Sequence, residues 1–173
     1  MLKKALIIID MLNDFIDEKG AMYCGEAARA IVPFIKKRLK DYRENGDLVI
    51  FVQANHDQSD KIFDRSPTYA IEGTWGCRTI PDLAPQRGEK ITLKRKFSGF
   101  YGTDLEHTLS SAQIKEVEVV GVCTSTCVMD TVGRLCDRDY EFIVVPPEGV
   151  ADIDPIAHDF ALKRMKQVYG ARI

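Results

Sequence analysis

The fold class is indicated most clearly by the segment Glu116-Val-Glu-Val-Val-Gly-Val-Cys-Thr-Ser-Thr-Cys127. Its first part, 116–122, is a short valine-rich run, which is typical of a strand buried on both faces of a parallel sheet. Small residues follow, and the segment 126–138 is predicted to be a helix. A strand that turns directly into a helix is the repeating unit of an α/β fold.

Four more apolar runs of this kind lie before and after this segment, at Ala5–Ile9, Asp47–Gln53, Lys90–Lys94 and Glu141–Val145. Helical patterns lie between most of them. One helix is predicted over 26–44, a second is opened by a capping box at Thr103–Glu106, and a third follows Asp154-Pro155. We therefore predict one domain, residues 1–173, with a doubly wound, mostly parallel sheet and helices on both faces. The range 54–89 lacks periodicity and is expected to shape a binding site or an interface.

Composition excludes several classes of protein. The net charge of −2 offers no basic patch for nucleic acid or for an anionic membrane. No apolar run is long enough to span a bilayer, and the N-terminus does not read as a signal peptide. Five cysteines, an odd number, favour reduced thiols, so we expect a cytoplasmic protein.

Three reactive residues fall at predicted strand ends. Asp10 closes the first strand, Lys94 closes the third, and Cys127 lies just past the fourth. Ligands of open parallel sheets bind beyond these ends. Backbone N–H groups at the start of a helix are expected to lower the pKa of the Cys127 thiol and to stabilise an oxyanion. Taken singly, each residue also has an ordinary interpretation without a catalytic role. Cys127 could be a structural cysteine, Asp10 a turn residue and Lys94 a surface lysine.

Together these stretches resemble the isochorismatase-like cysteine hydrolases, the superfamily that includes nicotinamidases. The resemblance rests on three ordered motifs and covers almost the whole chain. The motifs are Ile7-Ile-Ile-Asp10-Met-Leu-Asn-Asp14-Phe15, Lys94-Arg-Lys-Phe-Ser98-Gly-Phe100 with Gly102-Thr-Asp-Leu105, and Gly121-Val-Cys-Thr-Ser-Thr-Cys127-Val128.

The resemblance implies a mechanism for these residues. Asp10 takes the proton of the Cys127 thiol and later delivers it to the leaving group, while Lys94 holds both in charged form. The thiolate attacks an amide-type carbonyl and gives a thioester, which water hydrolyses. The oxyanion is held by the backbone N–H groups of Cys123 and Cys127, and a cis peptide is implied at Val122–Cys123.

The chain departs from the family at the metal site. Nicotinamidases bind a metal through an Asp-x-His segment after the second strand and a further His before a Gly-Thr pair. Here Ala54 and Tyr69 occupy the first Asp and the further His positions, and only His56 remains. We read His56 as a surface loop residue and expect no catalytic metal and no cofactor. Nicotinamide is then a doubtful substrate, and the ether cleavage of isochorismatases proper, which lack the cysteine, is not expected.

The expected partner is a small-molecule amide, and the resemblance implies a homo-oligomer. Phe15 and Phe97 match pocket-lining positions of the family. Trp75 lies in the long loop, where it covers the pocket or serves an interface or packing. Three alternatives stay open: a nicotinamidase with an altered metal site, a catalytically silent relative, and a redox protein that uses the Cys-x3-Cys pair Cys123 and Cys127.

Overall fold

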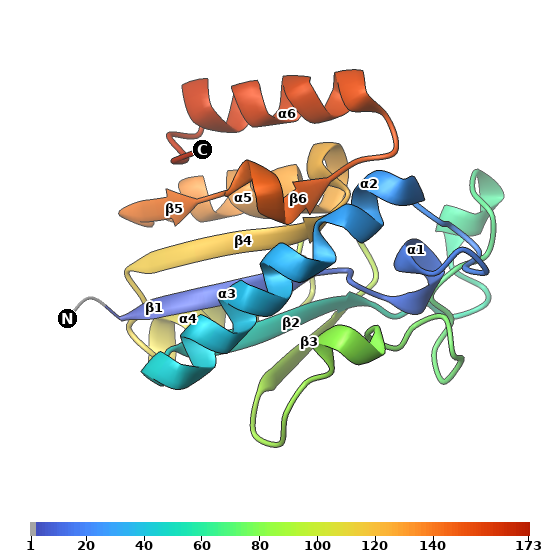
Figure 1. The fold of residues 1–173 in the computed structure, drawn as a ribbon, viewed down its shortest axis with the longest axis horizontal. Coiled ribbons are helices and arrows are strands. Elements are labelled where there is room, and N and C mark those ends of the chain that lie inside the picture. The colour runs from blue at the N-terminus through green and yellow to red at the C-terminus, as the bar shows by residue number, and fades with distance from the viewer. Residues whose placement is uncertain (1–2) are drawn as a thin grey trace.

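The computed structural model describes residues 3–173 and contains a six-stranded parallel sheet (Figure 1). Its main path has the order β3-β2-β1-β4-β5, and β6 pairs with β4. The bounds are β1 Lys4–Ile9, β2 Leu48–Ala54, β3 Lys90–Lys94, β4 Glu116–Val122, β5 Phe142–Val144 and β6 Val150–Ala151. The first strand, β1, lies at the centre of the sheet. The strands β2 and β3 follow on one side of β1, and β4 and β5 lie on the other side. The carboxyl ends of β1 and β4 therefore form the topological switch point, where such sheets bind ligands.

Helices cover both faces of the sheet, so the prediction of a doubly wound α/β fold is confirmed. Along β1, Leu6 and Ile8 pack on one face with Ile35 and Leu39 of α3. Ile7 and its same-face neighbours pack on the other face against α4, α5 and α6. In Figure 1, α3 lies in front of the sheet and α4 behind it. The helices are α1 Asn13–Ile16, α2 Gly25–Ala30, α3 Val32–Asn45, α4 Leu105–Ser111, α5 Met129–Cys136 and α6 Pro155–Gln167.

The single helix predicted over 26–44 is wrong, because the segment forms two helices that meet at Ile31. Pro33 explains the break. It lies in the first turn of α3, where its missing N–H costs nothing, whereas in one continuous helix its ring would meet the carbonyl of Arg29.

The capping box at Thr103–Glu106 is also wrong. The N-cap of α4 is Asp104, which makes no side-chain capping bond and instead contacts Lys90. The Thr103 hydroxyl donates to the carbonyl of Gly99. The Asp154 cap of α6 is confirmed, since its carboxylate accepts from the N–H groups of two residues of the first turn, Ile156 and Ala157.

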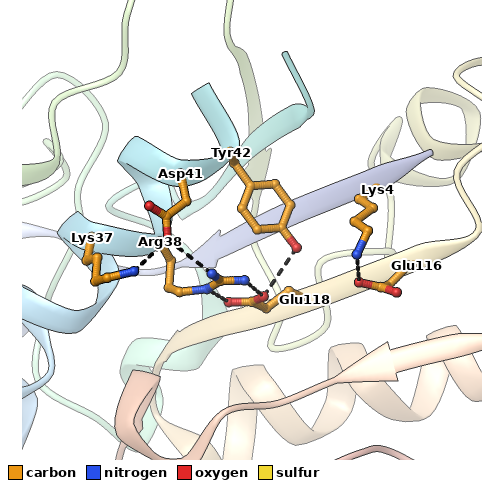
Figure 2. A network of polar contacts seen from close by, with 7 residues as sticks. All are labelled: Lys4, Lys37, Arg38, Asp41, Tyr42, Glu116 and Glu118. Carbon is orange, nitrogen blue, oxygen red and sulfur yellow. Dashed lines mark hydrogen bonds and ion pairs between the residues drawn. The ribbon is translucent and has the colours of Figure 1, made fainter. Parts of the chain in front are cut away.

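A buried acid on β4 ties α3 to the sheet (Figure 2). Glu118 is 4% exposed and accepts from Nε of Arg38 at 2.7 Å and from the hydroxyl of Tyr42 at 3.2 Å. The Glu118 carboxylate holds the pKa of Arg38 above its usual value, although burial opposes the charge. A buried acid needs such partners, so these contacts fix α3 over β4.

The range 54–89 has little regular structure beyond the last residue of β2. It contains only the 3₁₀ turns Lys61–Asp64 and Pro81–Leu83 and a few isolated bridges. Within residues 3–173, no helix is long and apolar enough to cross a membrane. The cytoplasmic location and the homo-oligomer stay predictions.

Candidate active site

The carboxyl ends of β1 and β3 and the turn after β4 bring Asp10, Lys94 and Cys127 together. Nζ of Lys94 lies 2.8 Å from Oδ2 of Asp10 and 3.4 Å from Sγ of Cys127. The side chains of Asp10 and Lys94 are only 2% and 3% exposed. The three residues named from the sequence thus form one contiguous cluster at the switch point of the sheet.

The two oxygens of Asp10 have different surroundings. Oδ1 accepts the N–H of Ala54 at 2.7 Å, which fixes the carboxylate against the end of β2. Oδ2 is buried and, among residues 3–173, receives no hydrogen bond of proper geometry. Despite burial, Asp10 and Cys127 hold the pKa of Lys94 above its ordinary value, so the lysine stays a cation. The cluster therefore holds a fixed positive charge beside a carboxylate oxygen that is free to accept a proton.

Cys127 lies in a π-turn, Thr124–Val128, immediately before α5. Burial raises the pKa of its thiol to about 12, against the lowering effect of Lys94. The predicted lowering of this pKa is therefore wrong, because desolvation of the thiolate outweighs the nearby cation. Cys127 is itself only partly buried, and a thiol with a raised pKa needs a base within reach to act as a nucleophile.

The backbone beside the cluster has two special features. The Val122–Cys123 peptide is cis, as the resemblance implies. Gly121 has φ +122°, and a Cβ there would lie 2.0 Å from the carbonyl oxygen of Ile9. Only glycine lets β4 approach β1 this closely, one residue before Asp10. Sequence analysis gave Gly121 no such role.

A cavity of about 610 Å³ opens above the cluster, and its lining includes all three residues. Phe15 and Phe97, both named from the sequence, lie in its wall. Trp75 does not, and it is 47% exposed elsewhere on the loop. His56 and Tyr69, which the sequence placed at the family's metal positions, also line the cavity. Further wall residues to which the sequence assigned no role include Met22, Ile62 and Asp152.

The cavity wall also holds a pair of thiols. Sγ of Cys123 lies 3.5 Å from Sγ of Cys24, and both cysteines are free. The redox alternative paired Cys123 with Cys127, but the sulfur that contacts Cys123 belongs to Cys24. No sequence pattern links these two, because Cys24 precedes α2 and is brought over the sheet by the fold.

His56 is buried, so its reading as a surface residue is wrong. It is 4% exposed, and its Nδ1 lies 3.0 Å from Oδ2 of Asp60. Ala54 and Tyr69 occupy the other two positions where nicotinamidases hold their metal, and neither supplies a ligand of the expected type. No group of three or more His, Cys, Asp or Glu side chains suited to a metal occurs within residues 3–173. The donor set therefore does not fit a bound metal.

Comparisons with known proteins agree with this geometry. The family model for the isochorismatase domain matches residues 4–173. The chain belongs to the isochorismatase family. Within that family, its sequence is 35% identical to PncA of Bacillus subtilis over 99% of each chain.

Solved structures of the isochorismatase family extend the likeness to three dimensions. The crystal structure of the nicotinamidase/pyrazinamidase PncA from Bacillus subtilis is 36% identical and superposes with a TM-score of 0.93 over 99% of this chain and 98% of that one. N-carbamoylsarcosine amidase from Thermoplasma acidophilum is 30% identical, with a TM-score of 0.89 over 99% and 95% of the chains. A pyrazinamidase of Pyrococcus horikoshii in complex with zinc is 26% identical, with a TM-score of 0.91 over 99% and 98%.

Proposed function

We propose that this isochorismatase-family hydrolase cleaves the C–N bond of a small amide through a thioester on Cys127. The buried contact among Asp10, Lys94 and Cys127 carries this proposal. A thiol, a carboxylate that can accept its proton and a fixed cation are the three groups that nucleophilic amide cleavage requires.

In the first half-reaction, Oδ2 of Asp10 takes the thiol proton as Sγ of Cys127 attacks the substrate carbonyl. Proton transfer of this kind contributes about 10²–10⁴-fold to a rate. Lys94 stays charged and lies beside both groups, which offsets the cost of placing negative charge on sulfur in a buried site. The backbone N–H groups of Cys123 and Cys127 hold the oxyanion, and a single such donor contributes about 10²–10³-fold.

The first half-reaction ends when Asp10 gives this proton to the amine, which leaves, and the thioester is formed. In the second half-reaction, Asp10 accepts a proton from the attacking water and returns it to the sulfur of Cys127. The water attacks the thioester, which releases the acid and restores the thiol of Cys127. No step needs a metal, since the residues around His56 do not form a metal site. The names of the relatives, which include nicotinamidase and N-carbamoylsarcosine amidase, support an amide substrate over other carbonyl compounds for this chain.

The test is hydrolysis of a panel of primary amides by wild type, Cys127→Ala and the matched control Cys123→Ala. Cys127→Ala should lose amide release entirely with an unchanged circular dichroism spectrum. Cys123→Ala should retain most activity, because only its backbone N–H is used. Mass spectrometry after rapid acid quenching should find the acyl group on Cys127.

Hydrolysis that survives in Cys127→Ala overturns the proposal. A redox function predicts the reverse pattern, in which Cys123→Ala is the damaging change and the activity follows oxidation of the Cys24 and Cys123 thiols. A silent relative would release no product from any amide and would form no acyl adduct on Cys127.

A further inference from the structure

The pair of the buried His56 and the partly buried Asp60 is a dyad that the proposed reaction does not use. The backbone fixes His56 on both sides, because its N–H donates to Ala70 at 2.9 Å and its carbonyl accepts from Glu72 at 2.9 Å. The imidazole lies edge-on to the rings of Phe63 and Tyr69, with centroid distances of 5.4 and 5.1 Å. The ring is therefore held in one position, with its Nδ1 3.0 Å from Asp60.

The partner of Nδ1 sets the tautomer of the ring. The His56 bond and the N–H of Asp57 hold the pKa of Asp60 below its usual value, even though burial opposes the charge. An ionised carboxylate only accepts hydrogen bonds, so Nδ1 carries the proton. In the neutral imidazole, Nε2 then keeps its lone pair and is an acceptor.

Nε2 of His56 faces no protein donor. It makes no hydrogen bond within residues 3–173. If Nε2 were fully buried, it would therefore be a buried polar atom without a partner, and among these residues it is not one. The small exposed part of the ring, 5% of the side chain, therefore includes Nε2. Because His56 lines the cavity of the active site, this free acceptor opens into the cavity.

The dyad is close to the reacting groups. The N–H of Ala54 binds Asp10 at 2.7 Å, and the N–H of Asn55 binds the carbonyl of Lys94 at 3.0 Å, so His56 follows the cluster directly along the chain. Tyr69 packs against both His56 and Phe15, with a centroid distance of 5.4 Å to Phe15. His56, Tyr69 and Phe15 thus line the same cavity as the reacting groups.

We propose that His56, oriented by Asp60, determines specificity by accepting a hydrogen bond from an N–H or O–H group at the end of the substrate remote from the scissile amide. The substrate class is a small amide with an apolar body and a distal donor, bound without a metal. This inference rests on the proposed function. A molecule whose distal atom is itself an acceptor, such as the ring nitrogen of nicotinamide, would place two lone pairs face to face.

The test compares 3-hydroxybenzamide, which has a distal donor, with benzamide, which has none, and nicotinamide, which has an acceptor. Wild type should prefer 3-hydroxybenzamide by about tenfold or more in kcat/KM, since loss of one neutral hydrogen bond corresponds to roughly that factor. His56→Phe, which keeps the ring packing but has no acceptor, should abolish the preference. The matched control is His107→Phe, on the exposed face of α4, and it should leave the preference unchanged.

Binding to Cys127→Ala, measured by calorimetry, separates this inference from the proposed function. The same order of affinities in a protein that cannot hydrolyse amides supports His56 even if Cys127 proves not to be the nucleophile. Equal affinities and equal kcat/KM values for the three compounds overturn the inference and leave the proposed function standing. Stoichiometric binding of Zn²⁺ alone to wild type, lost in His56→Phe, also overturns it, because a metal would then occupy Nε2.

Discussion

The buried ion pair between Asp10 and Lys94 makes the strongest prediction about stability. With 2.8 Å between the charged atoms and an effective dielectric constant of about 20, Coulomb's law gives an attraction of about 6 kcal/mol. Asp10→Asn leaves Lys94 as a buried cation, and Lys94→Met leaves Asp10 as a buried anion. Each single change should therefore lower the free energy of unfolding by about 3–5 kcal/mol, a large share of the ~5–15 kcal/mol that holds a domain together.

The double variant Asp10→Asn/Lys94→Met carries no buried charge, so it should lose less than the sum of the two single changes by about 3 kcal/mol or more. The assay is urea denaturation followed by far-UV circular dichroism at pH 7. The matched control is the cycle Lys90→Met and Asp104→Asn at the start of the same strand, where the side chains are 33% and 54% exposed. An exposed pair contributes about 0–1 kcal/mol, so this control should show little coupling. If the loss in the double variant equals the sum of the losses in the two single variants, Asp10 and Lys94 are not coupled. That result would refute the reasoning that burial couples the two charges.

Two further predictions concern pH and the strand end. Burial raises the pKa of Cys127 and of Tyr69 to about 12, so the folded state binds these protons more tightly than the unfolded state. Their contribution to stability is complete below about pH 8.5 and is lost as the pH rises toward 12. Measured by urea denaturation, Cys127→Ala should flatten the early part of this decline. An unchanged slope of the free energy of unfolding against pH would contradict the prediction. Gly121→Ala forces a Cβ to 2.0 Å from the carbonyl oxygen of Ile9 at φ +122° and should cost about 3 kcal/mol or more. Gly46→Ala, at φ +71° with nothing within 4 Å, should cost only about 1 kcal/mol by the same assay, and equal losses would show that the contact with Ile9 is unimportant.

Much of the fold could be predicted because its determinants are local. The runs ending at Ile9 and Val122 are rich in Ile and Val, which is typical of strands buried on both faces. For the run Lys90–Lys94 this prediction is wrong, because β3 is an edge strand in which Ile91 and Leu93 are 44% and 53% exposed. Right-handed crossovers then place the carboxyl ends of these strands on one edge of the sheet. For this reason Asp10, Lys94 and Cys127 could be named as neighbours before any coordinates were known.

The errors have two sources, which are a local helix breaker within a periodic segment and tertiary interactions that override the local pattern. Pro33 divides an otherwise continuous helical periodicity, and Asp104 contacts Lys90 on β3 instead of capping α4. The pKa of Cys127 depends on how completely the thiol is desolvated, which the cavity decides and which the position beside a helix does not.

Short runs of residues are enough to predict the parallel sheet, its two helical layers and the three reactive strand ends, because each depends on a local pattern. Which groups share the cavity depends instead on contacts between distant parts of the chain. His56 and Asp60 form a dyad and Trp75 stays outside, since loops of the range 54–89 are positioned by long-range packing and not by periodicity. Cys24, just before α2, is likewise brought to Cys123 by long-range packing. The identity of the substrate depends on that cavity wall. The type of reaction is therefore easier to predict from the sequence than the substrate.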